Sequence, residues 1–442
     1  MLRLYFSLFL AFLSISNPLS AQSTPHFSTP KRQFTLPFEL AHNLVIIPVY
    51  IQGIRFHFIL DTGVNYTLLF VNHQTDLAHF DTHPILITGL GKGVPVEAYK
   101  TTGHAIQIGK MTLNDQTILL FDKENYAFAK KMGTQIDGVI GAAFFKDIVA
   151  TINYSKKKIK ISSVENFTAP KSKKLKEIPL EFHNNKPLIR AKVTQNDQDF
   201  EGTFLLDSGS SDALWLFENR MDHFDEPLFF EDYLGHGING DVYGKRSKID
   251  VFDLDFIKLK QVKVAYPEQN ALINMTLKDD RLGSIGGELL SRFSVTLDYT
   301  NKKLYLRKST RVKAPFYYNM SGISLEHDGV EMIKQRTHTP NRINDQDSNT
   351  TGSIEIFLRD QFTIRLTPVV VIAQVRPDSP AAQSGIQVGD QLLRVNGKNV
   401  RFLKLDQING LMQIKPGSQL RLKIRRDGHI LHKSFRVTSL LE

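Results

Sequence analysis

Two copies of one short motif, set 146 residues apart, constrain this chain more than any other feature of its sequence. Phe58-Ile59-Leu60 runs into Asp61-Thr62-Gly63, and Phe204-Leu205-Leu206 runs into Asp207-Ser208-Gly209. Each apolar triplet is typical of a short buried strand, and the small polar residues after it end that strand in a turn. A single Asp-hydroxyl-Gly turn is ordinary surface chemistry. Two copies predict a carboxylate at the ends of two equivalent core strands.

The similarity between the two halves continues beyond this motif. With the same offset, and with an offset of 145 after a one-residue gap, further glycines and whole segments coincide. The aligned pairs are Gly89 with Gly235, Gly91 with Gly237, residues 138–141 with 283–286, and residues 151–154 with 296–299. Each copy is long enough to bury its own core. The sequence therefore predicts one duplicated domain, and not a solenoid of short repeats.

The first copy has the pattern of a mainly β domain. Short apolar runs with alternation are broken by Gly, Asn and Pro, and few windows keep a helical period. We expect one short helix at most near 125–132, a second helical candidate at 142–147, and a hairpin at 154–159. The same order of elements recurs in the second copy. We therefore predict lobes at 32–165 and 177–308, joined by a linker at 166–176 that carries Pro170 and several lysines.

The first 22 residues have the pattern of a secretory signal peptide. An apolar stretch from Leu4 to Ile15 is followed by small residues around Ala21, and the stretch is too short to span a bilayer. Cleavage is expected after Ala21 or Ser23. A retained membrane anchor is the alternative. The pattern predicts an exported protein, periplasmic or secreted.

Composition removes several classes of function. The chain has no cysteine, which excludes disulfides, a thiol nucleophile and a cysteine-ligated metal, and which fits a bacterial exported protein. The net charge is +10, but the basic clusters at 156–158 and 171–176 fall in a predicted turn and a linker. No nucleic-acid partner is expected. His73, His79 and His83 lack ligand spacing, so we expect no metal, and we also expect no cofactor and a monomer.

Two aspartates in such a duplicated domain can catalyse hydrolysis. If the copies pack about a pseudo-twofold axis, Asp61 and Asp207 meet there and share one proton, because two adjacent carboxylates do not both ionise easily. One then acts as general base toward a water that attacks a peptide carbonyl, and the other acts as general acid. Thr62 and Ser208 can hydrogen-bond across the axis. Gly63 and Gly209 allow close approach of the backbone.

These paired motifs resemble the aspartic peptidases of the pepsin and retropepsin type. The resemblance covers about residues 32–308 and implies two β-barrel-like lobes. It implies that Ile140-Gly141 and Ile285-Gly286 cross behind the two aspartate loops. It also implies hairpin flaps over the substrate. The matching segments are Gly89 to Tyr99 in the first copy, which includes Gly91, and Gly235 to Tyr243 in the second, which includes Gly237. Two flaps are therefore expected.

The chain departs from that family at two places. Val64-Asn65 follows Gly63 where a small residue and then Ser or Thr is usual, whereas the second copy keeps Ser210-Ser211. By the resemblance Ser211 donates to the outer oxygen of Asp207, and Asn65 would have to use its amide. The second apolar-apolar-Gly turn begins with Ser284, a milder change.

The C-terminal part, 315–442, resembles a PDZ domain of the kind found beside exported bacterial proteases. Residues 377–382 and 385–397 carry the resemblance, a helix is expected at 405–412, and a polar insert is expected at 335–353 as a loop. The family's carboxylate-binding loop corresponds to Ser321-Gly322-Ile323-Ser324-Leu325, whose backbone N–H groups would receive a peptide C-terminus. A PDZ domain that only braces the lobes is the alternative.

The sequence thus predicts an exported bacterial aspartic endopeptidase, mainly β, with Asp61 and Asp207 as its dyad and a PDZ domain that recruits protein substrates. One alternative is a non-catalytic peptide-binding protein that retains the fold, for which Asn65 is the best support. Another is an envelope scaffold that acts only through its PDZ domain.

Overall fold

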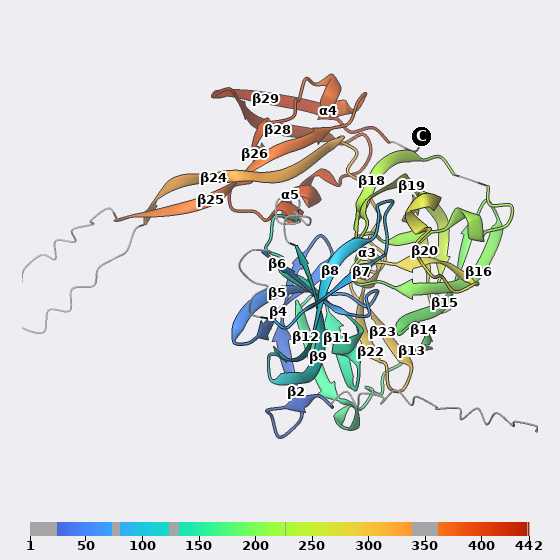
Figure 1. Cartoon of the computed structure of the whole chain (residues 1–442). Coiled ribbons are helices and arrows are strands. Elements are labelled where there is room, and N and C mark those ends of the chain that lie inside the picture. Colours follow the sequence, from blue (N-terminus) through green and yellow to red (C-terminus); the bar gives the residue numbers. More distant parts are fainter. Residues whose placement is uncertain are drawn as a thin grey trace, which may run out of the picture.

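The computed structural model describes residues 24–72, 80–122, 132–225, 227–337, 361–439 and 441. In these residues the chain is mainly β, as predicted (Figure 1). No helix within these ranges is long and apolar enough to cross a membrane. The predicted signal peptide, His73, His79 and most of the predicted 125–132 helix lie outside them. The short helices are α2 (Ala142–Phe145), α3 (Gly287–Leu290), α4 (Pro380–Gln383) and α5 (Leu405–Met412), with 3-10 helices η3 (Val164–Asn166), η4 (Glu218–Arg220) and η5 (Gln269–Leu272).

The first copy of the repeat forms a sheet of nine strands within the described residues. The strand order is β1-β9-β6-β10-β5-β4-β8-β7, with β3 paired to β4. Strand β5 runs parallel to β10, which lies between β5 and β6. The bounds are β1 (His26–Phe27), β3 (Glu39–Ala41), β4 (Leu44–Ile51), β5 (Ile54–Leu60), β6 (Thr67–Val71), β7 (His83–Ile87), β8 (Val96–Ile108), β9 (Met111–Asp122) and β10 (Gly138–Ile140). We call this sheet the first lobe.

The second copy repeats this plan in an eight-stranded sheet, which we call the second lobe. Its order is β14-β15-β16-β21-β17-β20-β19-β18, and β16 runs parallel to β21 as β5 does to β10. The bounds are β14 (Glu181–His183), β15 (Lys186–Gln195), β16 (Gln198–Leu206), β17 (Leu214–Leu216), β18 (Phe230–Gly237), β19 (Gly240–Asp253), β20 (Lys258–Pro267) and β21 (Arg281–Ile285). The motif strands β5 and β16 therefore occupy equivalent places.

A third sheet joins the two copies in the order β13-β23-β22-β11-β12-β2. Its central pair, β11 and β22, is antiparallel and sets Thr151 opposite Thr296, with their hydroxyl oxygens 2.9 Å apart. These threonines are equivalent in the repeat, so the pseudo-twofold axis passes between them. The bounds are β2 (Gln33–Pro37), β11 (Ile148–Asn153), β12 (Lys158–Ser163), β13 (Leu175–Pro179), β22 (Phe293–Asp298) and β23 (Lys303–Lys308). The predicted linker therefore ends earlier than 176, because Leu175 and Lys176 pair with β23.

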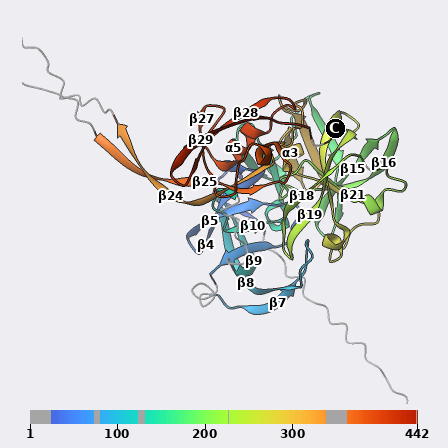
Figure 2. The same cartoon turned by 90° about the horizontal axis from the view of Figure 1, so that it is seen from above.

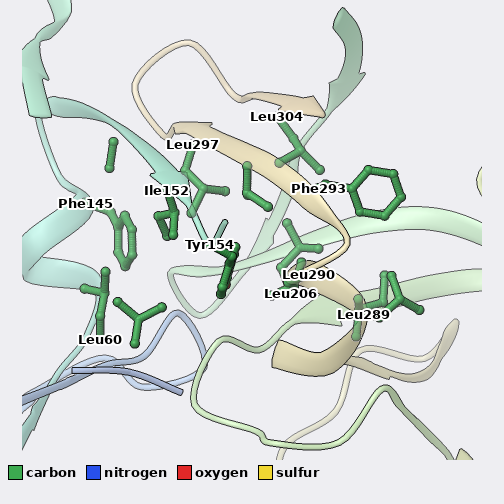
Figure 3. Close-up of a cluster of buried hydrophobic side chains, with 14 of the residues drawn as sticks. Leu60, Phe145, Ile152, Tyr154, Leu206, Leu289, Leu290, Phe293, Leu297 and Leu304 are labelled. Carbon is green, nitrogen blue, oxygen red and sulfur yellow. The ribbon is translucent and has the colours of Figure 1, made fainter. Parts of the chain in front are cut away.

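The two copies share one hydrophobic core beneath the motif strands. Leu60 and Leu206, the residues immediately before the two aspartates, are both buried in it. Figure 3 shows side chains of both copies converging there, including Phe145 and Ile152 from the first and Leu290, Phe293 and Leu297 from the second. The ends of the motif strands are thus fixed relative to each other by packing.

The C-terminal unit has its own sheet, in the order β24-β25-β26-β28-β29 with β27 on β26, and its own core. The bounds are β24 (Ile323–Thr337), β25 (Gln361–Val375), β26 (Gln391–Val395), β27 (Lys398–Asn399), β28 (Gln419–Arg426) and β29 (His429–Arg436). The Ser379 hydroxyl caps α4, and Asn396-Gly397, both at positive φ, closes the β26–β27 turn. The helix expected at 405–412 is α5.

The predicted insert at 335–353 begins too early. Residues 335–337 belong to β24 and pair with residues 361–363 of β25. Backbone pairing in an antiparallel ribbon does not require apolar side chains, so a polar stretch can extend a strand. The ribbon projects from the rest of the unit in both views (Figures 1 and 2).

The C-terminal unit contacts both lobes. The Tyr318 hydroxyl donates to the carbonyls of Ser247, at 2.6 Å, and Val264, at 3.0 Å, in the second lobe. Lys404 forms an ion pair with Glu39 of the first lobe at 2.7 Å. The unit is therefore held against the lobes by specific polar contacts.

Replacing Phe145 by Ala should destabilise the shared core. Phe145 is 1% exposed and stacks on Tyr299 with ring centroids 5.1 Å apart. We expect a loss of about 3–5 kcal/mol in the free energy of unfolding, measured by urea denaturation. Phe402→Ala, at a side chain that is 59% exposed, should change it by less than about 0.5 kcal/mol. Equal effects of the two variants would contradict the shared core.

Candidate active site

Thr62 and Ser208 tie the two aspartate loops together across the pseudo-twofold axis. The Thr62 hydroxyl donates to the carbonyl of Leu206 at 2.6 Å and accepts from the Ser208 N–H at 3.0 Å. In return the Ser208 hydroxyl donates to the carbonyl of Leu60 at 2.8 Å and accepts from the Thr62 N–H at 3.1 Å. Both side chains are buried. Because a hydroxyl both donates and accepts, each serves two backbone groups of the opposite lobe.

Each aspartate is shaped by its own glycine and lies against the other glycine. The Asp61 carboxylate accepts from the Gly63 N–H at 2.6 Å, and the Asp207 carboxylate accepts from the Gly209 N–H at 3.2 Å. A Cβ on Gly63 would lie 3.0 Å from Asp207 Oδ1, and a Cβ on Gly209 would overlap the Asp61 carboxyl. The glycines therefore leave room for two carboxyls side by side at the axis.

The apolar-apolar-Gly turns lie behind these loops. The Asp61 N–H donates to the Ile140 carbonyl at 3.0 Å, and the Asp207 N–H donates to the Ile285 carbonyl at 2.9 Å. A side chain at Gly141 or Gly286 would overlap a backbone carbonyl of the adjacent aspartate loop. These residues therefore support the loops from the side opposite the carboxyls.

The structure does not place Ser211 as expected. In the described residues its hydroxyl makes no hydrogen bond to Asp207, and its carbonyl accepts from the Asn43 side chain at 3.0 Å. The amide oxygen of Asn65 in the first loop is buried without a hydrogen-bond partner. Among the described residues, the side chains at these two positions thus make no hydrogen bond to the outer oxygens of the dyad.

Two hairpins, β7–β8 and β18–β19, meet at their tips through Asn239. The Asn239 N–H donates to Leu90 O at 2.9 Å, and its carbonyl accepts from Gly93 N–H at 2.7 Å. Its side chain accepts from the Gly89 N–H and donates to Val94 O at 2.5 Å. Asn239 is 3% exposed. Sequence reasoning did not single out this residue, although it lies in the glycine-rich stretch 235–240.

The predicted flap glycines and tyrosines have different places. Gly89, Gly91 and Gly237 lie where the tips touch, since a side chain at Gly91 or Gly237 would overlap backbone of the opposite hairpin. Gly235 has open space around it. The Tyr99 hydroxyl instead donates to Glu97 at 2.8 Å, and the ring of Tyr243 packs edge-on against Tyr233. The glycines thus permit the contact between the hairpins, whereas Tyr99 and Tyr243 each contact a residue of their own hairpin.

Trp215 lies outside the main core, next to these hairpins. It is half-buried in a small cluster with Leu90 of the first hairpin and Leu234 and Val242 of the second. Its indole N–H donates to Asp212 at 2.7 Å, at the end of the second aspartate loop. The side chain therefore connects that loop to the hairpins.

Two cations that the sequence analysis missed lie near the dyad, both on the second lobe. Arg281, at the start of β21, is 5% exposed and donates to Gly283 O at 3.1 Å and to the Ser284 hydroxyl at 2.9 Å. Its guanidinium lies 5.3 Å from the Phe217 ring centroid. Lys186, at the start of β15, is half-buried. The polar residue at position 284 is explained by this contact, because the Ser284 hydroxyl accepts a hydrogen bond from the buried arginine.

Burial and charge set the protonation of the dyad. Burial, and after it the charge of Asp207, raise the pKa of Asp61 to about 7. Burial also raises the pKa of Asp207, but the charges of Arg281 and then Lys186 oppose that rise. The pair therefore retains one proton up to neutral pH, and these charges favour that proton on Asp61.

A cavity of about 480 Å³ separates the second lobe from the predicted carboxylate-binding loop. Gly322, Ile323 and Ser324 line it. The Asn319 side chain accepts from the Ser321 N–H at 3.1 Å and donates to Ile323 O at 2.8 Å. The Ile323 N–H donates to the Ser321 hydroxyl at 3.2 Å. The N–H groups of Ser321 and Ile323, two of the donors that were expected to receive a peptide carboxylate, are thus already hydrogen-bonded to side chains of this chain.

Across the described ranges, no group of three or more His, Asp or Glu side chains is arranged to hold a metal ion. Of the three histidines that lie close in sequence, only His83 falls within those ranges, exposed at the start of β7.

Comparison with known proteins identifies two domains. A family model described as aspartyl protease matches residues 47–144, which include Asp61, and one described as PDZ domain matches residues 371–426. The chain therefore contains an aspartyl protease domain and a C-terminal PDZ domain, as the sequence analysis predicted. The first match covers one copy of the repeat, so the role of Asp207 rests on the duplication and on the geometry described above.

Shorter matches connect the chain to bacterial proteases. A probable periplasmic serine endoprotease, DegP-like, of Pseudomonas fulva is 35% identical over 71 residues, which are 16% of this chain and 15% of that protein. The serine endoprotease DegS of Haemophilus influenzae is 43% identical over 63 residues, which are 14% of this chain and 18% of that protein. The chain thus spans less than a fifth of the length of these relatives.

Replacing Thr62 tests the connection between the two loops. Thr62→Ala leaves the buried Leu206 carbonyl and Ser208 N–H without their partner, at a cost of about 1–3 kcal/mol for each group. Thr62→Ser keeps the hydroxyl and removes one methyl, which should cost about 1 kcal/mol or less. Urea denaturation of both variants measures the difference. Equal stabilities would show that these hydrogen bonds do not hold the lobes together.

Proposed function

We propose that this chain, which contains an aspartyl protease domain and a PDZ domain, is an exported aspartic endopeptidase with Asp61 and Asp207 as its catalytic pair. The observation that carries the proposal is that two loops, cross-linked by Thr62 and Ser208, present these carboxyls side by side. A pair that retains one proton contains a general base and a general acid at the same pH.

The reaction follows from this protonation. The ionised carboxylate takes a proton from a water molecule, whose oxygen attacks the carbonyl carbon of the scissile peptide bond, while the protonated carboxyl gives its proton to the carbonyl oxygen. When the tetrahedral intermediate collapses, the C–N bond breaks, the leaving nitrogen receives the proton that the first carboxylate took from the water, and the second carboxyl regains a proton from a hydroxyl of the intermediate. The products are a carboxylic acid and an amine. The chain's own side chains supply each proton transfer.

The hairpins that meet at Asn239 would act as paired flaps. Their contacts must open to admit a polypeptide and can re-form over it, which would exclude bulk water from the reaction. An extended protein segment is the substrate that fits two β-hairpins, because a strand can hydrogen-bond to strand edges.

The PDZ domain would bind a peptide C-terminus at Gly322, Ile323 and Ser324. The Ser321 hydroxyl, which accepts from the Ile323 N–H at 3.2 Å, would have to leave that N–H first. We further propose export by the 1–22 signal peptide to the periplasm, where DegP-like relatives are named as residing, and action as a monomer without a cofactor.

A non-catalytic peptide-binding protein is the second candidate. It is favoured by the amide oxygen of Asn65, which is buried beside the first aspartate loop without a partner. Such a protein would bind a statine peptide but would cleave no substrate.

Cleavage of an unstructured protein separates the two candidates. The mature protein should cleave casein at pH below about 7 and lose activity above it, because the pKa of Asp61 is about 7 and the shared proton is then lost. Asp61→Asn and Asp207→Asn should each lower the rate by roughly 10²- to 10⁴-fold. Asp427→Asn, at the exposed β28–β29 turn, should not.

The same assay with a statine peptide should show inhibition of the wild-type protein. Absence of cleavage between pH 3 and 8 by a protein shown to be folded by circular dichroism would contradict the proposal. Unchanged cleavage in either dyad variant would do so as well.

A further inference from the structure

The two lobes differ in charge next to the dyad, although they share one backbone plan. Ile140 pairs with Leu60 in the first copy as Ile285 pairs with Leu206 in the second, so Ile140 and Ile285 are equivalent. Four residues earlier in each copy, Ile136 therefore corresponds to Arg281. Both are buried. By the strand pairings of β4 with β5 and β15 with β16, Leu44 corresponds to Lys186. The first lobe thus has apolar residues where the second lobe has cations.

Arg281 is buried without an acidic hydrogen-bond partner among the described residues. Its contacts are to the Gly283 carbonyl, the Ser284 hydroxyl and the Phe217 ring. None of these groups neutralises a positive charge. The acidic group that acts on it most strongly is Asp207, which directly follows the neighbouring parallel strand β16. A buried charge without an ionic partner is costly. Here the positive charge of Arg281 acts on one carboxyl of the dyad, that of Asp207.

The guanidinium retains its charge at neutral pH. Burial lowers the pKa of Arg281 to about 10, which is still well above 7. Burial and then the charge of Arg281 lower the pKa of Lys186, while both aspartates oppose that fall. Tyr299 is a further titratable side chain near the dyad. Burial and the charge of Asp61 raise its pKa well above the usual value, so it stays neutral.

We infer that Arg281 is a positioning residue that keeps Asp207 as the carboxylate of the dyad, with Lys186 in support, and so leaves the shared proton on Asp61. This inference rests on the proposed catalytic function. It assigns the roles: Asp207 takes the proton from the attacking water, and Asp61 gives its proton to the carbonyl oxygen. It also assigns Ser284 the role of holding the guanidinium in place.

The direction of the pH effect follows from the sign of the charge. A nearby cation favours the ionised form of a carboxyl, so its removal makes Asp207 harder to ionise. The acid limb of the pH–rate profile, where the dyad goes from two protons to one, should then move to higher pH. Arg281 acts on Asp207 and Lys186 acts on both carboxyls. The alkaline limb should therefore move less in an Arg281 variant than in a Lys186 variant.

The test compares casein cleavage between pH 3 and 8 for Arg281→Met, Arg281→Lys and the matched control Arg292→Met. Arg292 is also buried in the second copy, where its guanidinium lies over Phe316. Each cleavage rate is expressed relative to the same protein's rate at its pH optimum. On that scale, Arg281→Met should be about three- to tenfold slower than the wild type at the acid end of the profile. Arg281→Lys should recover part of the loss. Arg292→Met should keep the wild-type profile shape.

A measurement independent of activity separates this inference from the proposed function. The carboxyl carbons of Asp61 and Asp207, labelled with ¹³C and assigned with the two Asn variants, report ionisation by NMR. In Arg281→Met the Asp207 carboxyl should titrate at higher pH than in the wild type. An unchanged Asp207 titration in a folded variant would overturn the inference. Failure of the proposed function would instead appear as a wild-type protein that cleaves nothing.

Discussion

The crossed hydrogen bonds of Thr62 and Ser208 are the interaction on which the rest of the structure depends. Each buried hydroxyl satisfies a carbonyl and an N–H of the opposite loop. Neither lobe can complete this pattern alone, because every bond joins residues from different copies. The carboxyls at the axis are therefore positioned by the assembly of both lobes, and the shared core beneath them fixes the strands that deliver them.

This near-symmetric frame carries an asymmetric electrostatic environment. A dyad of two identical carboxyls in identical surroundings would have no preferred site for its proton. Here the second lobe replaces two buried apolar positions with Arg281 and Lys186. The desolvation of Arg281 is offset by two hydrogen bonds, by an aromatic ring and by attraction to Asp207. These contacts hold a buried positive charge at a place where it can act on the dyad.

Much of the frame could be predicted from the sequence because it depends on local patterns. The repeated apolar-Asp-hydroxyl-Gly motif gave the dyad loops, and its matching positions predicted the cross-axis role of Thr62 and Ser208. Residues 377–382 and 385–397, which contain the cap of α4 and the Asn396-Gly397 turn, carried the resemblance to a PDZ domain. These features depend on backbone geometry that a few residues determine, so they are visible without knowledge of the neighbours in space.

The features that were missed depend on contacts between distant segments. Asn239 is one polar residue in a glycine-rich turn until it meets the first hairpin. Trp215 is an aromatic residue in an apolar run until it joins the cluster that includes Leu90 of the first hairpin. Ser211 followed the family pattern in sequence, yet in the described residues its hydroxyl makes no hydrogen bond to Asp207. The repeat alignment did contain one unused signal. It aligned Arg281 with Ile136 and Ser284 with Val139, so one buried strand has polar residues at two positions where its copy has apolar ones. The two polar residues explain each other because Arg281 donates a hydrogen bond to Ser284.

The most direct test of the central claim is a crystal structure of the protein with a bound statine-type peptide. The account predicts that the statine hydroxyl, which stands for the attacking water, lies between Asp61 and Asp207 within hydrogen-bond distance of both carboxyls, beneath closed hairpins. A peptide bound elsewhere, or a hydroxyl in contact with neither carboxyl, would contradict it.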